Sequence, residues 1–206
     1  MASRPAFYVS NNQVTSKNAT FEWASGFAVS QKKKNVTRLH SALGKPCLEV
    51  STKSDIPLGI SLSAFTLTLN GYTLENIFQS SKVFQNGGPY LDLLTVSPKD
   101  AKRDPRLKNS GNLKGFEFNN YFWPLIPKTV FYDYLYCKAV SNCIDINDLK
   151  KICDYTFFTD IEFNPSRSIN TQARSIAIVK LMIQLWGEVV DLSPEQFIEF
   201  HSRFVR

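Results

Sequence analysis

The stretch LSAFTLTLNGYTLENIFQSSKVF, residues 62–84, decides most about the fold of this chain. Asn70-Gly71 is a turn signal, and Thr73 is a typical N-cap for a helix over residues 73–85. Before the turn, β-branched and aromatic residues favour a strand over residues 60–69. The stretch therefore predicts a strand, a turn and a helix in that order.

The segments on either side of this stretch favour helices. Apolar residues recur at helical spacing in SQKKKNVTRLHSAL, residues 30–43, and the longest helical pattern is SINTQARSIAIVKLMIQLWGEVV, residues 168–190. A capping box with Pro at the first helical position, Ser193-Pro194-Glu195-Gln196, opens a last helix. Further helices are expected over residues 128–140 and 145–154.

Strands are few by the same criteria. CLEVSTKS, residues 47–54, has the composition of a strand. Residues 1–18 are polar and expected to be loose, and residues 108–120 are expected to form a loop. The expected fold class is therefore α+β, mostly helical, with a few short strands in a single domain. Residues 1–45 are expected to be an N-terminal extension that packs on or flanks a domain of residues 46–206.

Charge and composition limit the classes of partner. A net charge of +6 favours an anionic partner such as nucleic acid or a phosphorylated ligand, although a basic protein without such a partner would carry the same charge. No apolar run is long enough to cross a bilayer, and the first residues lack the apolar stretch of a signal peptide. The four cysteines form no CxxC pair and the two histidines are far apart. We therefore expect a cytoplasmic protein with reduced thiols and no metal site or cofactor.

Three residue patterns are candidates for chemistry. Glu75, Gln79 and Lys82 follow one face of the expected helix, where they form either a functional cluster or a solvated face with a weak ion pair. Asp160 ends an aromatic run and is followed by Arg167 and Arg174 at the start of the longest helix. That helix start is either an anion site for a pyrophosphate or an ordinary capped terminus.

Trp123, between Phe122 and Pro124, is the third of these patterns. Its ring is either part of the core or a wall on which a base stacks. Residue pattern alone leaves both interpretations open.

These segments resemble the NADAR superfamily, which has an N-glycosidase fold. Ser63-Ala64-Phe65 corresponds to the family's SNF strand, and Gly71, Glu75, Gln79 and Lys82 match the turn and helix that follow. The later matches, in order along the chain, are Ala101-Lys102-Arg103, Trp123, Asp160 and Asn170. The likeness extends over about 150 residues and is closest to the branch that accompanies DarT-type DNA ADP-ribosyltransferase toxins. Two positions depart from the pattern: Ala64 replaces the Asn of SNF, and Phe163 replaces a Trp.

The resemblance implies a hydrolase that releases ADP-ribose from guanine bases in DNA, as an antitoxin or a counter-defence protein. It implies Glu75 and Asp160 as the acidic pair, and Lys53 as a catalytic lysine, which is otherwise one more surface lysine. Substrate would be bound by the following residues: Phe65, Gln79, Lys82, Arg103, Trp123, Asn170 and Arg174. The partners implied are DNA with an ADP-ribose adduct on guanine, free ADP-ribose as product, and a DarT-type toxin, with no membrane.

Two other functions stay open at this stage. One is an N-glycosidase of small phosphoribosyl intermediates, as in riboflavin synthesis. The other is a non-catalytic module that binds ADP-ribose or NAD. The basic clusters and the N-terminal segment favour a nucleic-acid substrate, because a small substrate would not need them. Replacing Glu75 and Asp160 by amides separates an enzyme from a binding module.

Overall fold

A β-hairpin opens the computed structural model, which describes residues 1–166 and 168–205 and so leaves Arg167 outside the described residues. β1 (Ala2–Ser10) and β2 (Gln13–Phe21) pair antiparallel along their whole length. Asn11 and Asn12 connect them with φ values of 51° and 55°. Asparagine tolerates this left-handed conformation, which a two-residue hairpin turn requires. The prediction that residues 1–18 are loose is therefore wrong.

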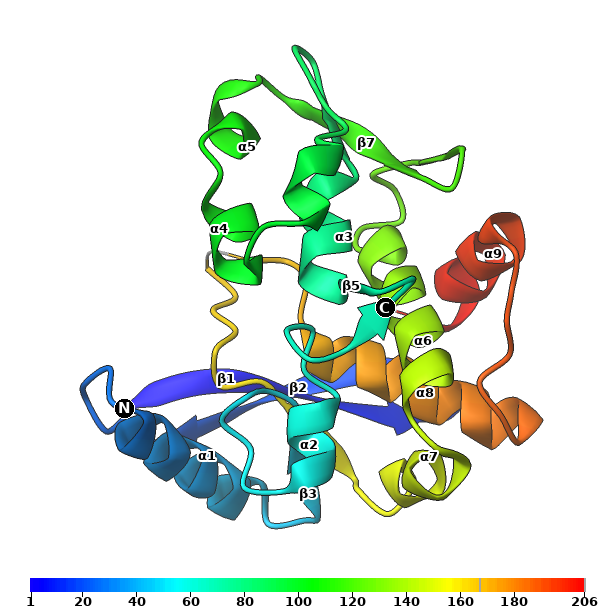
Figure 1. Ribbon diagram of the computed structural model, residues 1–206. Helices are drawn as coiled ribbons and strands as arrows, with labels where there is room; N and C mark the ends of the chain where they lie inside the picture. Colours follow the sequence, from blue (N-terminus) through cyan, green and yellow to red (C-terminus); the bar gives the residue numbers. More distant parts are fainter. Residues whose placement is uncertain (167, 206) are drawn as a thin grey trace.

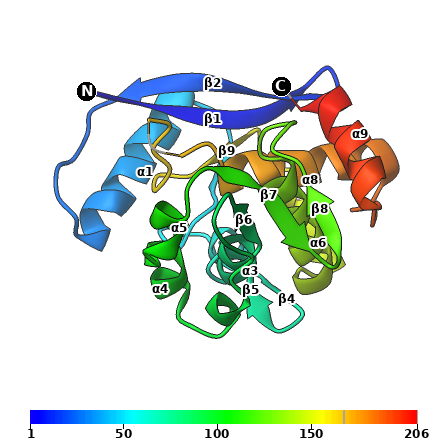
Figure 2. The ribbon, with the colours of Figure 1, turned by 90° about the horizontal axis from the view of Figure 1, so that it is seen from above.

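The hairpin belongs to a four-stranded sheet with the order β2-β1-β9-β3. β3 (Cys47–Glu49) and β9 (Phe157–Thr159) pair in parallel, and β1 meets β9 at Phe7 and Phe158. Seen from above, the hairpin runs along one side of the molecule, with α1 near one end and the last helix near the other (Figure 2). The hairpin thus packs on the rest of the chain, and a division at residue 45 stays a prediction.

A second sheet replaces the loop that was expected over residues 108–120. β6 (Lys82–Phe84), β7 (Leu113–Phe118) and β8 (Tyr121–Trp123) form an antiparallel sheet in that order. Asn119 and Asn120, both at positive φ, make the turn between the last two strands. The predicted loop is therefore wrong. As at the first hairpin, a pair of asparagines forms the turn between two strands.

The remaining elements are mostly helical, so the expected α+β class with a helical majority is confirmed (Figure 1). They are, in chain order, α1 (Val29–Leu43), α2 (Pro57–Ser61), β4 (Thr68–Leu69), β5 (Tyr72–Thr73), α3 (Leu74–Ser80), the 3-10 helix η1 (Leu91–Leu94), α4 (Pro98–Arg103), α5 (Arg106–Asn109), α6 (Val130–Cys143), α7 (Ile146–Ile152), α8 (Gln172–Trp186) and α9 (Pro194–Phe204). The predicted capping box at Ser193 and Gln196 is confirmed at the start of α9.

The stretch that decides the fold differs from its prediction at both ends. Of the predicted strand over residues 60–69, only Thr68–Leu69 (β4) form a strand. The backbone of Ala64 bonds to distant groups instead of to a neighbouring strand: its N–H donates to Gln172 and its carbonyl accepts from Glu75. The predicted turn at Asn70-Gly71 and the N-cap at Thr73 are confirmed.

α3 ends at Ser80, earlier than predicted, and the chain continues into β6. The hydroxyls of Ser80 and Ser81 both donate to the carbonyl of Ile77, which competes with the helical pattern. The backbone N–H of Glu117 then bonds to the carbonyl of Ser81 and joins the chain to the second sheet.

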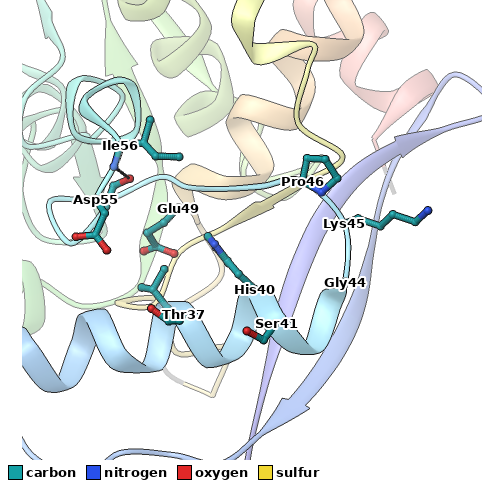
Figure 3. Close-up of a pocket in the computed structure, with 11 residues that line it drawn as sticks. Thr37, His40, Ser41, Gly44, Lys45, Pro46, Glu49, Asp55 and Ile56 are labelled. Atoms are coloured by element: carbon teal, nitrogen blue, oxygen red, sulfur yellow. Dashed lines mark hydrogen bonds between the residues drawn. The ribbon is translucent and has the colours of Figure 1, made fainter.

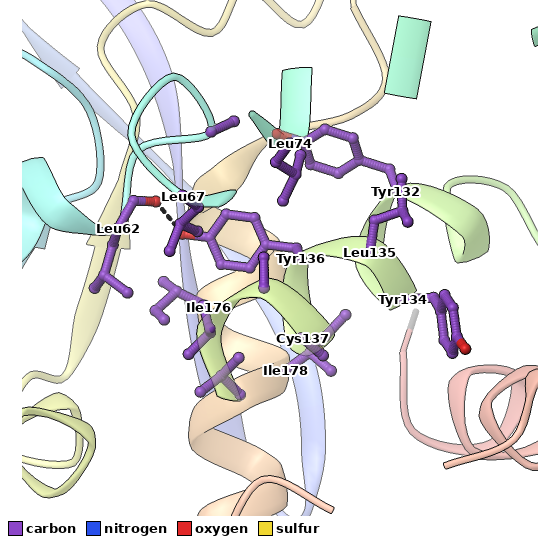
Figure 4. Packing of buried hydrophobic residues seen from close by; sticks show 14 of the residues in the cluster. Leu62, Leu67, Leu74, Tyr132, Tyr134, Leu135, Tyr136, Cys137, Ile176 and Ile178 are labelled. Carbon is purple, nitrogen blue, oxygen red and sulfur yellow. Dashed lines mark hydrogen bonds between the residues drawn. The ribbon is translucent and has the colours of Figure 1, made fainter. Parts of the chain in front are cut away.

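The core lies where α6 and α8 cross, with α8 packed against the strands of the first sheet. Leu62, Leu135 and Ile176 are fully buried there, and the hydroxyl of Tyr136 donates to the carbonyl of Leu62 at 2.5 Å (Figure 4). This hydrogen bond satisfies the buried tyrosine and fixes the segment after α2 against α6.

A buried carboxylate joins the three helices α6, α8 and α9. Asp133 is 0% exposed, and its carboxylate accepts from Ser175 at 2.6 Å and from Thr129 at 2.9 Å. Arg174 lies at 3.1 Å and His201 at 3.0 Å from its Oδ2. Burial alone would raise the pKa of Asp133, but Arg174 and His201 hold it below its ordinary value.

Candidate functional site

An acid, an amide and a cation form one hydrogen-bonded chain at α3. Gln79 Nε2 donates to Glu75 Oε1 at 2.8 Å, and Lys82 Nζ donates to Gln79 Oε1 at 2.6 Å. Glu75 and Gln79 are each only 5% exposed. The alternative of a solvated helix face is therefore wrong, although Lys82 lies on β6 and not on the helix as expected.

A lysine on α4 lies at the solvent side of this hydrogen-bonded group of Glu75, Gln79 and Lys82. Lys102 Nζ lies 3.7 Å from Glu75 Oε1 and 5.6 Å from the ring centroid of Phe65. The ring of Phe65 is 41% exposed, so an aromatic face and a cation stand at the solvent side of a buried carboxylate. Lys102 matches the family pattern but is not among the predicted site residues; the prediction names its neighbour Arg103, which is exposed on the same short helix.

Lys82 has an altered acidity because of where it lies. Burial lowers the pKa of its ammonium group to about 8, with Glu75 opposing this shift and Lys102 adding to it. Its Nζ also lies 4.9 Å from the ring centroid of Phe78. Lys82 is therefore a cation held inside the site and hydrogen-bonded to Gln79.

The second acid, Asp160, lies beside the start of α8. Its Oδ2 accepts from Gln172 Nε2 at 3.3 Å and from Thr171 Oγ1 at 3.4 Å. Gln172 Oε1 in turn accepts from the N–H of Ala64, whose carbonyl accepts from the N–H of Glu75. Glu75 and Asp160 are thus joined through Ala64 and Gln172, although 85 positions separate them in the sequence.

Asp160 shares its surroundings with a third carboxyl, that of Glu49 on β3. Both side chains are buried, at 8% and 1% exposure. Burial, and then the charge of Glu49, raise the pKa of Asp160 to about 7. Burial also raises the pKa of Glu49, against hydrogen bonds from Ser51, Ile161 and Thr159 that lower it. One of the two carboxyls therefore holds a proton near neutral pH.

Sequence reasoning missed two residues of this region, Glu49 and Tyr132. Tyr132 is buried on α6, and its ring meets that of Phe78 edge to face at 5.1 Å. Burial raises the pKa of its phenol well above the ordinary value, and the charges of Glu75 and Asp160 add to the rise. No local pattern marks either residue, because each acquires its neighbours only through the tertiary fold.

Lys53 lies in the segment after β3, between Ser51 and Asp55. Its backbone N–H donates to Ser51 Oγ, and its half-buried side chain donates to the hydroxyl of Thr52 at 2.8 Å. Hydrogen bonds through Ser51 and Glu49 connect Lys53 to the turn that holds Asp160, and none of the hydrogen bonds or ion pairs of the described residues joins Lys53 to Glu75.

A cavity of about 560 Å³ separates α1 from residues 45–56 (Figure 3). His40 and Thr37 from α1 and the carboxylate of Glu49 point into it, whereas Lys45 points away. Burial lowers the pKa of His40 to about 4, so its imidazole is neutral at neutral pH. At this cavity Thr159 contacts His40 and Glu49, whereas the next residue, Asp160, contacts Gln172.

Three further residues that were predicted to bind substrate differ in their burial and in their hydrogen-bond partners. Trp123 is 0% exposed, with its ring 4.3 Å from that of Tyr134, so the prediction that it stacks on a ligand is wrong and its aromatic surface serves the core. Arg174 pairs with the buried Asp133, and its role in binding substrate stays a prediction. Asn170 is half-buried, and its Oδ1 has no hydrogen-bond partner among the described residues. An acceptor of this kind suits a donor group on a ligand.

Two other properties bear on function. Within residues 1–166 and 168–205, no cluster of three or more His, Cys, Asp or Glu side chains is arranged to hold a metal ion. In the same residues, no helix combines the length and the apolar character needed to cross a membrane.

Comparison with known proteins gives one family. The model of the DarT1-associated NADAR antitoxins matches residues 2–205. No match was found among curated proteins. The matched range includes the N-terminal hairpin, the Glu75 chain, the Asp160 turn and the last helix.

Proposed function

Because the chain belongs to the family of DarT1-associated NADAR antitoxins, we propose that it removes the ADP-ribose that a DarT-type toxin attaches to guanine in DNA. The proposed reaction breaks the bond between the anomeric carbon of the ribose and a guanine nitrogen. Water adds to that carbon, and the nitrogen keeps the electron pair and takes up a proton. The products are free ADP-ribose and unmodified DNA.

The observation that carries the proposal is the junction of Glu75 and Asp160 through Ala64 and Gln172. Cleavage of a glycosidic bond passes through an oxocarbenium-like state, which needs a carboxylate near the anomeric carbon and a proton donor for the leaving base. Asp160 has a pKa of about 7 and so retains a proton near neutral pH. We assign it the role of proton donor and Glu75 the role of stabilising carboxylate.

The groups around the acids supply complementary binding chemistry. Phe65 offers an exposed ring for stacking on a base, with the Lys102 ammonium beside it. Lys82 offers a positive charge, and Asn170 offers an acceptor that has no partner in the part of the chain that the structure describes. Phosphate groups of the ADP-ribose fit the cations of this edge, Lys82, Lys102 and Arg103.

Lys53 suggests a different chemical route. A lysine amine can add to C1 of the ring-opened ribose, after which the bond from C1 to the guanine nitrogen breaks and that nitrogen takes up a proton. Water then hydrolyses the imine left between the lysine and C1, which releases ADP-ribose and restores the amine. Among the described residues, Lys53 is linked to the Asp160 turn through Ser51 and Glu49, and this separate position favours the direct route through Glu75 and Asp160. Lys53→Ala should therefore reduce the rate of ADP-ribose release less than Asp160→Asn does, when both are measured on the same ADP-ribosylated oligonucleotide. A larger loss in Lys53→Ala would replace the direct route by the imine route.

The pH dependence of the reaction follows from Asp160. As a proton donor it acts only while protonated, so kcat/KM is expected to be level below about pH 7 and to fall about tenfold per pH unit above it. Loss of the Lys82 charge above about pH 8 acts in the same direction. A pH series with the ADP-ribosylated oligonucleotide measures this limb. A rate that rises steadily from pH 6 to 9 would exclude Asp160 as the donor.

Arg103 provides a test of phosphate binding. Replacing it by glutamine is expected to raise the Kd for free ADP-ribose about tenfold, because one charge-assisted hydrogen bond to the pyrophosphate is lost. Lys108→Gln on the neighbouring α5 is the matched control, since Lys108 is also exposed and basic. Titration calorimetry measures the Kd of ADP-ribose for wild type and for the two variants. Equal affinities would remove Arg103 from the site.

A further inference from the structure

The buried carboxylate of Glu49 lies beside the site and accepts three short hydrogen bonds. Its Oε1 accepts from Ser51 Oγ at 2.6 Å and from the N–H of Ile161 at 2.8 Å, and its Oε2 accepts from Thr159 Oγ1 at 2.7 Å. The side chain is 1% exposed. Three donors from two separate segments therefore converge on one carboxylate.

Each donor connects Glu49 to an element of the proposed site. Ser51 Oγ also accepts from the N–H of Lys53, so this branch fixes the start of the Lys53 segment. Thr159 and Ile161 flank Asp160, so the other two branches hold the backbone on both sides of that residue. The carboxylate of Glu49 thus sets where the Lys53 segment and the Asp160 turn lie relative to each other.

The hydrogen bonds extend in a defined direction as far as α1. Thr159 has a single hydroxyl proton, which it donates to Glu49, so its oxygen accepts from His40 Nε2 at 2.8 Å. This assignment places a proton on Nε2 of His40, whose imidazole burial keeps neutral, and it connects the wall of the α1 cavity to the same carboxylate (Figure 3).

We propose that Glu49 is a positioning residue for the hydrolysis proposed above: it anchors the Asp160 turn and the Lys53 segment, and it keeps the proton of the acid pair on Asp160. The hydrogen-bond lengths support this division. Each carboxyl accepts three hydrogen bonds: those of Glu49 are 2.8 Å or shorter, as in an ionised carboxylate, whereas those of Asp160 are 3.1 Å or longer. Two neighbouring carboxyls whose surroundings differ in this way separate into an ion and an acid.

Other charged or titratable groups also surround Asp160. They are Glu162 on the same turn, Tyr132 and Tyr136 on α6, and the neutral His40 behind Thr159. Glu162 is exposed and paired with Lys32 at 2.7 Å, so solvent and that pairing weaken its effect. Glu49 is the buried carboxyl among them, and its removal should change Asp160 most.

The test is a titration of the Asp160 carboxyl by carbon NMR, assigned with Asp160→Asn, in wild type, Glu49→Gln and Glu162→Gln. Glu49→Gln is expected to lower the midpoint of Asp160 by about one pH unit, because a neighbouring negative charge is removed. Glu162→Gln, the matched control, should leave the midpoint close to that of wild type. An unchanged midpoint in a folded Glu49→Gln protein would overturn the proposal, and this readout needs no catalytic activity.

Two further measurements complete the test. If Glu49→Gln does not fold, Thr159→Val removes one donor with little change of shape; Glu49 then binds its proton more tightly, and the Asp160 midpoint should again fall. In the hydrolysis assay, the alkaline limb of Glu49→Gln should move down by the same amount as the NMR midpoint, with about a tenfold loss at pH 8 and a smaller loss at pH 5.5. An NMR shift without any hydrolysis by wild type would refute the proposed function while the effect of Glu49 on Asp160 held.

Discussion

Glu75→Gln is expected to lower the rate of ADP-ribose release by about 10²- to 10⁴-fold, the range that a positioned catalytic group contributes. The amide has nearly the same shape, so its oxygen can still accept from Gln79 Nε2, as Glu75 Oε1 does at 2.8 Å. What is lost is the negative charge that stabilises the oxocarbenium-like state, together with the attraction to Lys102 at 3.7 Å.

The Glu75 variant needs a control for charge alone. Glu117→Gln removes an exposed carboxylate on β7 and should leave the rate unchanged. Single-turnover release from an ADP-ribosylated oligonucleotide, with thermal melting to confirm folding, measures all three proteins. A folded Glu75→Gln protein that keeps a tenth or more of the wild-type rate would remove Glu75 from the chemistry. It would favour the route through Lys53.

Asp133→Asn is expected to reduce the free energy of unfolding by about 3–5 kcal/mol, the cost of removing one partner from a buried ion pair. Arg174, whose side chain is 12% exposed, would keep its charge without a partner, and His201 would lose its acceptor. The helices α6, α8 and α9 meet at this carboxylate, so its loss weakens the packing of all three. Urea denaturation at pH 7 measures the difference.

The effect of Asp133→Asn should depend on pH with a definite sign. The pKa of Asp133 lies below its ordinary value in the folded protein, so its stabilising effect is present above about pH 4 and is lost as the pH falls through the folded pKa. Asp191→Asn is the matched control. Asp191 pairs with Lys138 at 2.6 Å but is 73% exposed, and its loss should cost less than about 1 kcal/mol. Similar losses of unfolding free energy in the two variants would show that the buried Asp133 stabilises the fold no more than the exposed Asp191 does.

Local signals in the sequence were enough for several elements of the fold. The N-cap at Thr73, the turn at Asn70-Gly71 and the capping box at Ser193 each depend on residues a few positions apart, and each prediction was correct. The strands were harder, because β3 and β9 pair across about a hundred intervening residues. No window of sequence contains that pairing. The two hairpins at Asn11-Asn12 and Asn119-Asn120 do have a local signal, the paired asparagines at positive φ.

Some residues of the candidate site could likewise be predicted from local sequence, and others could not. The spacing of Glu75 and Gln79 predicted one shared face, which their hydrogen bond bears out. Glu49 and Tyr132 could not be found, because a glutamate in a strand and a tyrosine in an apolar helix carry no mark of their later neighbours. The prediction for Trp123 was wrong, because a tryptophan beside a turn has the same sequence pattern whether its ring faces solvent or the core.

The most direct test is to incubate the purified protein with a DNA oligonucleotide that carries ADP-ribose on guanine, and to follow free ADP-ribose by mass spectrometry beside Asp160→Asn. The account predicts release of ADP-ribose and recovery of the unmodified oligonucleotide with wild type, and little of either with the variant. No release by folded wild type would contradict the account. The assay would then turn to small phosphoribosyl substrates, and after them to binding of ADP-ribose without cleavage.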